Sequence, residues 1–100
     1  MKLIELNISR IREICRRYRV RSLAVFGSIL TDRFSDRSDV DLLVDFEDDV
    51  NHDNYTDNYF GLHDDLRTLL GREIDLVDNK AVSNRYFREE LDETKQLIYG

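Results

Sequence analysis

The segment from residue 39 to residue 46, DVDLLVDF, constrains the fold most, because its side chains alternate in character. Successive side chains of an extended strand point to opposite faces, so residues two apart share a face. One face of this strand carries Leu43 and two carboxylates, those of Asp39 and Asp41. The opposite face carries the apolar side chains of Val40, Leu42 and Val44. The pattern therefore predicts a β-strand with one apolar face and a charged rim.

Ahead of this strand, the sequence predicts an amphipathic helix and a short strand. Apolar residues recur at helical spacing near the start of the chain, while arginines fall largely on the other side of the same helix. The apolar stripe consists of Ile4, Ile8, Ile11, Ile14, Cys15 and Tyr18. Residues 22–26 are an apolar strand that ends at Gly27-Ser28, and residues 31–38 are polar and typical of a loop.

Behind the strand, the sequence predicts a loop, a helix, a third strand and a closing helix. Residues 45–57 are acidic and rich in Asn, as loops are, and the helix that follows ends at Gly71. Residues 73–78 form the third strand. The helical stripes are Tyr59, Leu62, Leu66, Leu69 and Leu70 in the first of these helices, and Phe87, Leu91, Thr94 and Ile98 in the closing one. We expect one α/β domain over residues 1–100, with no repeat or linker.

Composition excludes several classes of protein. A net charge of -6 argues against stable, sequence-independent binding of nucleic acid, which needs a basic face. No apolar run is long enough to cross a membrane, and Lys2 and Glu5 interrupt any signal-peptide pattern, so we expect a cytoplasmic protein. The single cysteine, Cys15, has no partner within the chain and is expected to be a small buried hydrophobe.

Charge is distributed unevenly along the chain. Residues 1–37 carry nine Lys or Arg against four acidic residues, whereas residues 45–66 carry eight acidic residues and no Lys or Arg. Ordinary solvated faces would explain this asymmetry, and so would a surface that docks a partner. The sequence leaves both explanations open.

The two carboxylates at the start of the alternating strand point to a cation. Asp39 and Asp41 project from one face, and such a like-charge pair is destabilising unless a cation neutralises it. Oxygen ligands without a nearby thiol or imidazole favour magnesium or manganese over zinc. The alternative is that Asp39 caps a turn and Asp41 lies at a solvated sheet edge.

Two further features favour a metal and phosphate site over that alternative. Gly27 permits close backbone approach at the end of the preceding strand, and its amide neighbours together with the Ser28 hydroxyl can hold phosphate oxygens. Asp75 adds a third carboxylate inside the apolar strand of residues 74–77. If that strand pairs in register with the strand of Asp39 and Asp41, all three acids face one cleft.

These residues carry a resemblance to a known family. The stretch GSILTDRFSDRSDVDLLV is similar to the nucleotidyltransferase signature, in which Gly-Ser precedes Asp-x-Asp by about ten residues, and ten residues separate Ser28 from Asp39 here. With IDLV and the closing YFREELDETKQLIYG, the chain resembles MNT-domain proteins, minimal nucleotidyltransferases encoded beside HEPN-domain ribonucleases. The resemblance covers essentially the whole chain.

The resemblance implies a fold and a site. The fold it implies is α/β (α+β), a small mixed β-sheet flanked by helices, as in the DNA polymerase β superfamily. Asp39, Asp41 and Asp75 would hold two magnesium ions and carry the catalysis, and Gly27 and Ser28 would bind the nucleotide triphosphate.

The resemblance also implies a function. Relatives act as antitoxins that transfer AMP from ATP to a tyrosine of a HEPN toxin, so ATP is the expected substrate and a HEPN-domain toxin the expected partner, in a homo- or hetero-oligomer. At Thr31, where many relatives carry an arginine, the sequence departs from the family pattern, and Arg33 or Arg37 could supply the missing charge. Two alternatives remain: a non-catalytic antitoxin that only binds its toxin, and a small-molecule nucleotidyltransferase of the aminoglycoside-modifying kind.

Overall fold

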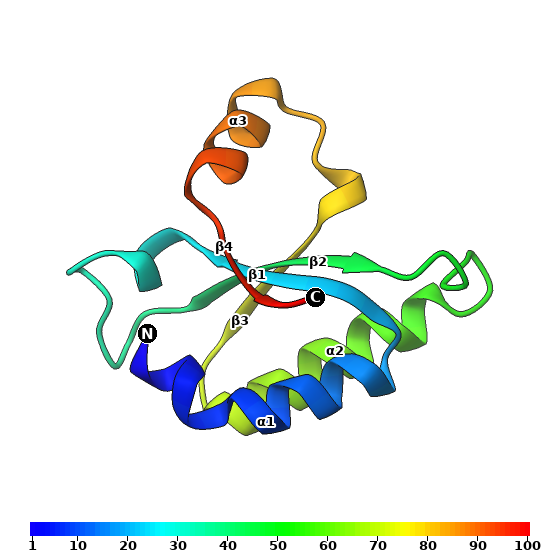
Figure 1. The fold of residues 1–100 in the computed structure, drawn as a ribbon, viewed down its shortest axis with the longest axis horizontal. Coiled ribbons are helices and arrows are strands. Elements are labelled where there is room, and N and C mark those ends of the chain that lie inside the picture. The colour runs from blue at the N-terminus through cyan, green and yellow to red at the C-terminus, as the bar shows by residue number, and fades with distance from the viewer.

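The computed structural model describes residues 1–100 as three layers, with two helices beneath a sheet and a third helix above it (Figure 1). Seven regular elements make up these layers, and two short 3₁₀ turns follow β1 and β3. In chain order they are α1 (Lys2–Arg17), β1 (Val20–Phe26), β2 (Val40–Phe46), α2 (Tyr55–Leu70), β3 (Ile74–Asp78), α3 (Arg85–Thr94) and β4 (Gln96–Tyr99), with the turns at Gly27–Leu30 and Asn79–Ala81.

The four strands form one mixed sheet in the order β3-β2-β1-β4. β1 pairs antiparallel with both β2 and β4, whereas β2 and β3 are parallel. Parallel neighbours need a crossover connection, and α2 provides it between β2 and β3. The expected class, a small mixed sheet flanked by helices, is confirmed.

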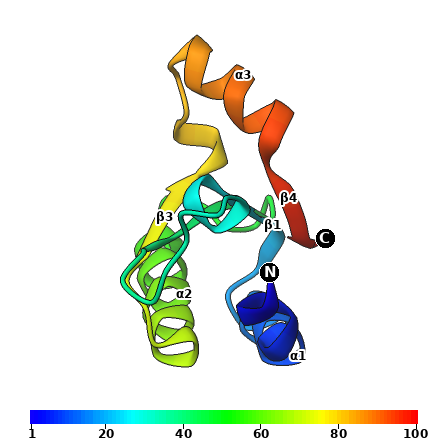
Figure 2. The ribbon, with the colours of Figure 1, turned by 90° about the vertical axis from the view of Figure 1, so that its left-hand side faces the viewer.

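The face of the sheet covered by α1 and α2 holds the main core. Figure 2 shows these two helices side by side against that face. Seventeen buried residues form one cluster there, including the predicted apolar face of β2 at Val40, Leu42 and Val44. Cys15 belongs to this cluster as predicted, and burial raises the pKa of its thiol to about 12. α2 ends, as predicted, at Gly71, whose φ of 65° is the left-handed conformation that glycine adopts without strain.

The opposite face of the sheet is covered only by α3. A small cluster of three buried residues, Ala24, Leu43 and Leu91, joins this helix to β1 and β2. Asn84 caps the start of α3, and its side chain accepts a hydrogen bond of 3.0 Å from the backbone N–H of Phe87. Much of this face is therefore free to carry polar groups.

The prediction of a closing helix that includes Ile98 was wrong. α3 ends at Thr94, Lys95 turns into an extended conformation, and residues 96–99 pair with β1 as the edge strand β4. An unpaired strand edge offers a row of free backbone donors and acceptors, and β1 would expose such an edge without this segment. Tertiary pairing thus overrides the weak helical spacing of the last residues.

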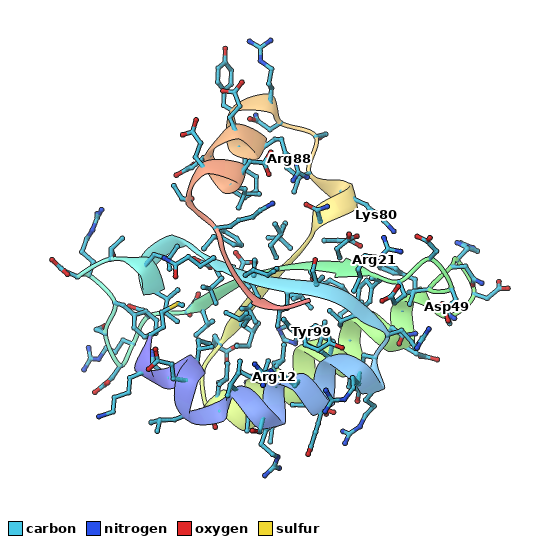
Figure 3. The ribbon with its side chains drawn as sticks, viewed as in Figure 1. Arg12, Arg21, Asp49, Lys80, Arg88 and Tyr99 are labelled. Atoms are coloured by element: carbon cyan, nitrogen blue, oxygen red, sulfur yellow. The ribbon has the colours of Figure 1, made fainter.

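Internal ion pairs account for part of the uneven charge. Three arginines from the basic first third of the chain contact aspartates of the acidic middle: Arg17 with Asp65 at 2.9 Å, Arg19 with Asp49 at 2.8 Å, and Arg21 with Asp48 at 2.7 Å. Arg21 and Lys80, labelled in Figure 3, both contact Asp45 at 3.8 Å. The first three pairs are solvent-exposed, so each contributes little stability. No helix is long and apolar enough to span a membrane.

Candidate active site

The pairing of β2 with β3 brings two predicted site residues together. In the parallel register, Asp41 lies opposite Asp75, and paired residues of adjacent strands project their side chains to the same face. Adjacent strands are about 4.8 Å apart, so the two carboxylates are direct neighbours. The in-register pairing on which the convergence of the three acids depends is therefore present.

Asp39, the residue just before β2, belongs to the same group of acids. The pKa of Asp41 is raised above its usual value, first by burial and then by the negative charges of Asp75 and Asp39. Asp41 is half-buried, whereas Asp39 and Asp75 are exposed. The three aspartates thus form a single electrostatic cluster on the sheet face opposite the main core.

The Gly27-Ser28 turn lies against this cluster. β1 pairs with β2 so that Phe26 is opposite Asp41, and Gly27 follows with a φ of 74°. A Cβ at Gly27 would overlap the Asp41 Oδ2 atom and lie 3.2 Å from its Cγ. The left-handed backbone favours glycine here, and any side chain at this position would require the Asp41 carboxylate to move. Thr31 closes the turn, and its hydroxyl donates a 2.8 Å hydrogen bond to the Ser28 carbonyl.

The chemistry of these groups suits a divalent cation. No ion pair or side-chain hydrogen bond involves Asp39, Asp41 or Asp75, so their oxygens remain free to act as ligands. All of the donors are hard carboxylate oxygens, as magnesium prefers. As the side chains stand, no three acidic, His or Cys side chains converge tightly enough to hold one ion. Mutual repulsion opposes such convergence, and a cation would reverse it.

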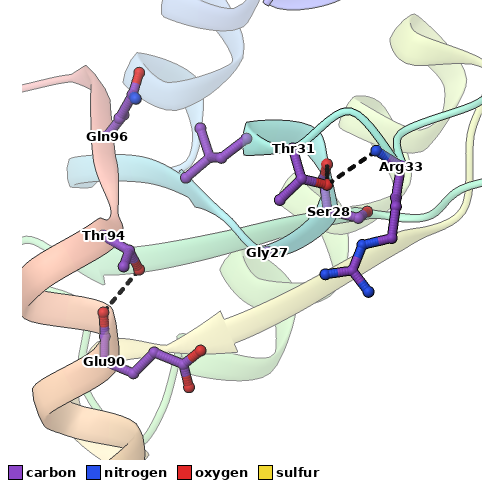
Figure 4. Close-up of a pocket in the computed structure, with 8 residues that line it drawn as sticks. Gly27, Ser28, Thr31, Arg33, Glu90, Thr94 and Gln96 are labelled. Atoms are coloured by element: carbon purple, nitrogen blue, oxygen red, sulfur yellow. Dashed lines mark hydrogen bonds between the residues drawn. The ribbon is translucent and has the colours of Figure 1, made fainter.

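A cleft of about 680 Å³ opens beside the turn. Its volume lies within the range of about 300 to 1,000 Å³ that is typical of small-molecule sites. Gly27, Ser28 and Arg33 lie on one side of it, and Glu90 of α3 lies on the other. In Figure 4 the Arg33 guanidinium and the Glu90 carboxylate both point into the space between them. Neither forms an ion pair within the chain, so both are available to a ligand.

Sequence reasoning missed the far wall of this cleft. Glu90, Thr94 and Gln96 line it, and no motif or spacing in the sequence distinguishes them. They meet the Gly27 turn only because β4 pairs with β1, which carries α3 to that end of the sheet. Of the two loop arginines considered earlier, Arg33 lines the cleft and Arg37 does not.

Three further polar side chains near β3 form hydrogen bonds within the fold. His63 is half-buried, and its Nε2 lies 3.0 Å from the Ile74 carbonyl oxygen. Tyr59 donates from its hydroxyl to the Leu76 carbonyl, and Tyr55 donates to Asp78 at 2.6 Å. His52 lies exposed in the acidic loop without a hydrogen bond.

The site combines two acids on paired strands, a third acid just before β2, a glycine turn and an adjoining cleft, which suits an enzyme that transfers nucleotidyl groups. Comparison with known proteins identifies the family. Residues 9–100 match the family described as Polymerase beta, Nucleotidyltransferase, so the chain belongs to this family of nucleotidyltransferase enzymes.

Two relatives are similar over most of their length. A protein of Methanocaldococcus jannaschii, assigned by its name to the protein adenylyltransferases, is 35% identical over 101 residues, which cover 93% of this chain and 97% of the relative. Protein adenylyltransferase MntA of Thermococcus cleftensis is 34% identical over 73 residues, which cover 73% of this chain and 70% of the relative.

Solved structures share the fold. A minimal nucleotidyltransferase superposes with a TM-score of 0.74 at 26% identity, covering 93% of this chain and 91% of that one. A complex of the tri-AMPylated HEPN toxin of Shewanella oneidensis with its MNT antitoxin gives a TM-score of 0.66 at 20% identity, covering 96% of this chain and 71% of that one. The polymerase β-like minimal nucleotidyltransferase fold is thus confirmed.

Proposed function

We propose that this chain is a magnesium-dependent protein adenylyltransferase that transfers AMP from ATP to a tyrosine of a HEPN-domain toxin and thereby acts as its antitoxin. One observation carries the proposal: the register of β2 and β3 sets Asp75 beside Asp41, next to the Gly27 turn. The relatives named as protein adenylyltransferases and the solved complex of an AMPylated HEPN toxin with an MNT antitoxin support the substrate and the partner.

The reaction forms one bond and breaks another. The tyrosine hydroxyl oxygen attacks the α-phosphorus of ATP, the bond from that phosphorus to the β-phosphate bridging oxygen breaks, and pyrophosphate leaves. Two magnesium ions, held by Asp39, Asp41 and Asp75, would supply charge stabilisation for the phosphates and activation of the hydroxyl. The Asp75 carboxylate is exposed on the same face and accepts the tyrosine proton.

The turn and the cleft orient the triphosphate. Gly27 has no side chain, which lets a phosphate approach the backbone, and the Ser28 hydroxyl donates a hydrogen bond to a phosphate oxygen. Arg33 lines the same cleft and carries the positive charge that faces the phosphates, in place of an arginine at position 31. A cation positioned in this way stabilises the charge that develops on the leaving pyrophosphate.

Label transfer tests the proposal directly. The chain is incubated with magnesium, ATP labelled on the α-phosphate and a purified HEPN-domain toxin, and the label on the toxin is measured. The double variant Asp39→Ala with Asp41→Ala is expected to transfer no label while remaining folded by circular dichroism. Undiminished transfer by this variant contradicts the proposal.

Asp45 offers a matched control on the same strand. It shares the sheet face of Asp41 but contacts Lys80 and Arg21, both at 3.8 Å, at the other end of β2. Asp45→Asn also removes one negative charge from β2, and it is expected to transfer label at the wild-type rate. Equal losses in Asp45→Asn and in the double variant would show that overall charge, not the site, governs transfer.

The two alternative functions give different outcomes in the same assay. A non-catalytic antitoxin inhibits its toxin without any transfer of label, and the double variant inhibits equally well. A small-molecule nucleotidyltransferase labels an aminoglycoside but not the toxin. The free carboxylates and the adjoining cleft favour catalysis over binding alone.

A further inference from the structure

A row of three polar side chains on α2 faces the open edge of β3. Tyr55, Tyr59 and His63 are spaced four residues apart, so they lie one above another on the helix. Each is half-buried, and each forms a hydrogen bond with β3: Tyr55 with the Asp78 carboxylate, Tyr59 with the Leu76 carbonyl and His63 with the Ile74 carbonyl. α2 is thus hydrogen-bonded to every second residue of β3.

The two carbonyls are those that β2 cannot reach. The Glu73 carbonyl accepts a 3.0 Å hydrogen bond from the backbone N–H of Val40. Alternate residues of a parallel strand face opposite sides, so the carbonyls of Ile74 and Leu76 point away from β2, toward the sheet edge. Tyr59 and His63 satisfy these outward carbonyls, which immediately flank Asp75 on both sides.

Resting on the function proposed above, we propose that Tyr59 and His63 are positioning residues that hold Asp75 beside Asp41, at the place where the cation site requires it. β3 is an edge strand of five residues with a single strand neighbour. Asp75 has no cationic partner and lies next to two other carboxylates, so repulsion acts to move it away from β2. The hydrogen bonds from Tyr59 and His63 hold the carbonyls on either side of Asp75 and so oppose that movement.

α2 can hold β3 in place because α2 is itself packed into the core. Leu62 and Leu66 of α2 are completely buried, and they lie within one turn of His63. His63 donates to the carbonyl through Nε2, so the hydrogen must be on that nitrogen, while Nδ1 lies 3.2 Å from Asp64 Oδ1. A glutamine at position 63 retains a donor near Nε2, whereas a leucine retains only the volume.

Tyr59→Phe is the sharpest test, because it removes only a hydroxyl. Tyr55→Phe is the matched control: it makes the same change one turn away on the same helix, at a bond to the side chain of Asp78 and not to a backbone carbonyl next to Asp75. Loss of one such hydrogen bond corresponds to a change of about three- to tenfold. We expect Tyr59→Phe to raise the magnesium concentration for half-maximal label transfer by that factor and Tyr55→Phe to leave it unchanged.

Backbone hydrogen exchange gives a second readout that does not depend on activity. Tyr59→Phe is expected to speed the exchange of the amides of Asp75 and Val77, which face β2, by about three- to tenfold, with little change in α1. His63→Leu is expected to act in the same direction, and His63→Gln to restore the wild-type exchange rate and magnesium requirement.

Each outcome separates this inference from the function on which it rests. If the wild-type chain transfers no label, the proposed function fails, and hydrogen exchange still tests whether Tyr59 and His63 hold the strand. If Tyr59→Phe lowers thermal stability but changes neither edge exchange nor the magnesium requirement more than Tyr55→Phe does, the role is merely structural. That result overturns the positioning of Asp75.

Discussion

The two faces of the sheet differ in what their side chains do. The face beneath β1 and β2 contributes to a cluster of 17 buried residues packed by α1 and α2. The other face has three buried residues under α3 and carries the aspartate cluster. β2 serves both faces by strict alternation, with Leu42 in the core and Asp41 among the acids. Because the buried core on one face stabilises the fold, the other face can carry carboxylates that repel one another.

Neighbouring residues of β2 should therefore separate function from stability. Asp41→Asn is expected to reduce label transfer by on the order of 100-fold or more, because a group that stabilises transition-state charge is lost. Its free energy of unfolding should not fall, because the substitution removes a half-buried negative charge. Transfer kinetics and thermal melts of the same preparation measure both effects. A variant that is destabilised but fully active would contradict this expectation.

The adjacent core position should behave in the opposite way. Leu42 is 1% exposed, and Leu42→Ala is expected to lower the free energy of unfolding by about 2 to 5 kcal/mol. Leu43 is 4% exposed on the other face, in the three-residue cluster, so Leu43→Ala should cost less, toward about 2 kcal/mol. Urea denaturation measures both values. A larger loss at Leu43 would show that the α3 face also carries the stability of the domain.

Two glycines with left-handed backbones sharpen the contrast further. Gly27→Ala and Gly71→Ala both place a Cβ at positive φ, at 74° and 65°, with a cost of about 1 to 3 kcal/mol each. Only at Gly27 does that Cβ meet Asp41, since nothing lies within 4 Å at Gly71. We expect both variants to lose similar stability but only Gly27→Ala to lose most of its label transfer. Equal activity in the two variants would argue against a role for the close approach.

The aspartate cluster should also leave a signature in the dependence of stability on pH. The pKa of Asp41 is raised in the folded state by burial and by Asp75 and Asp39, so over the window between its unfolded and folded pKa the folded state binds more protons. The contribution of Asp41 to stability therefore falls as pH rises through that window, and the full penalty is present at neutral pH. Asp41→Asn should melt at a higher temperature than the wild type at pH 7, and the difference should shrink in acid. A constant difference across this range would contradict the assignment.

The sequence predicted the covered face well and the open face in part. The alternation of residues 39–46 predicts that Val40, Leu42 and Val44 are buried. The same alternation predicts that Asp39 and Asp41 share a face. Placing Asp75 beside them needed a register that no local pattern contains, and the structure supplies it through the parallel pairing of β2 and β3.

The end of the chain was predictable only from tertiary structure. Leu91 and Ile98 fit a helical spacing, yet residues 96–99 form β4 because the edge of β1 is there to pair with. The far wall of the cleft, with Glu90 and Gln96, follows from that strand and was missed with it. The local pattern of a single sequence does not predict contacts between segments that are far apart in the chain.

Calorimetry tests whether the three aspartates and the Gly27 turn form one magnesium and nucleotide site. A non-hydrolysable ATP analogue is titrated into the wild-type chain, Asp75→Asn and Asp45→Asn, each with and without magnesium. We expect magnesium-dependent binding by the wild type and by Asp45→Asn, and a dissociation constant at least tenfold higher for Asp75→Asn, which corresponds to about 1.4 kcal/mol. Equal affinity of Asp75→Asn and the wild type, or binding that is indifferent to magnesium, would contradict that expectation.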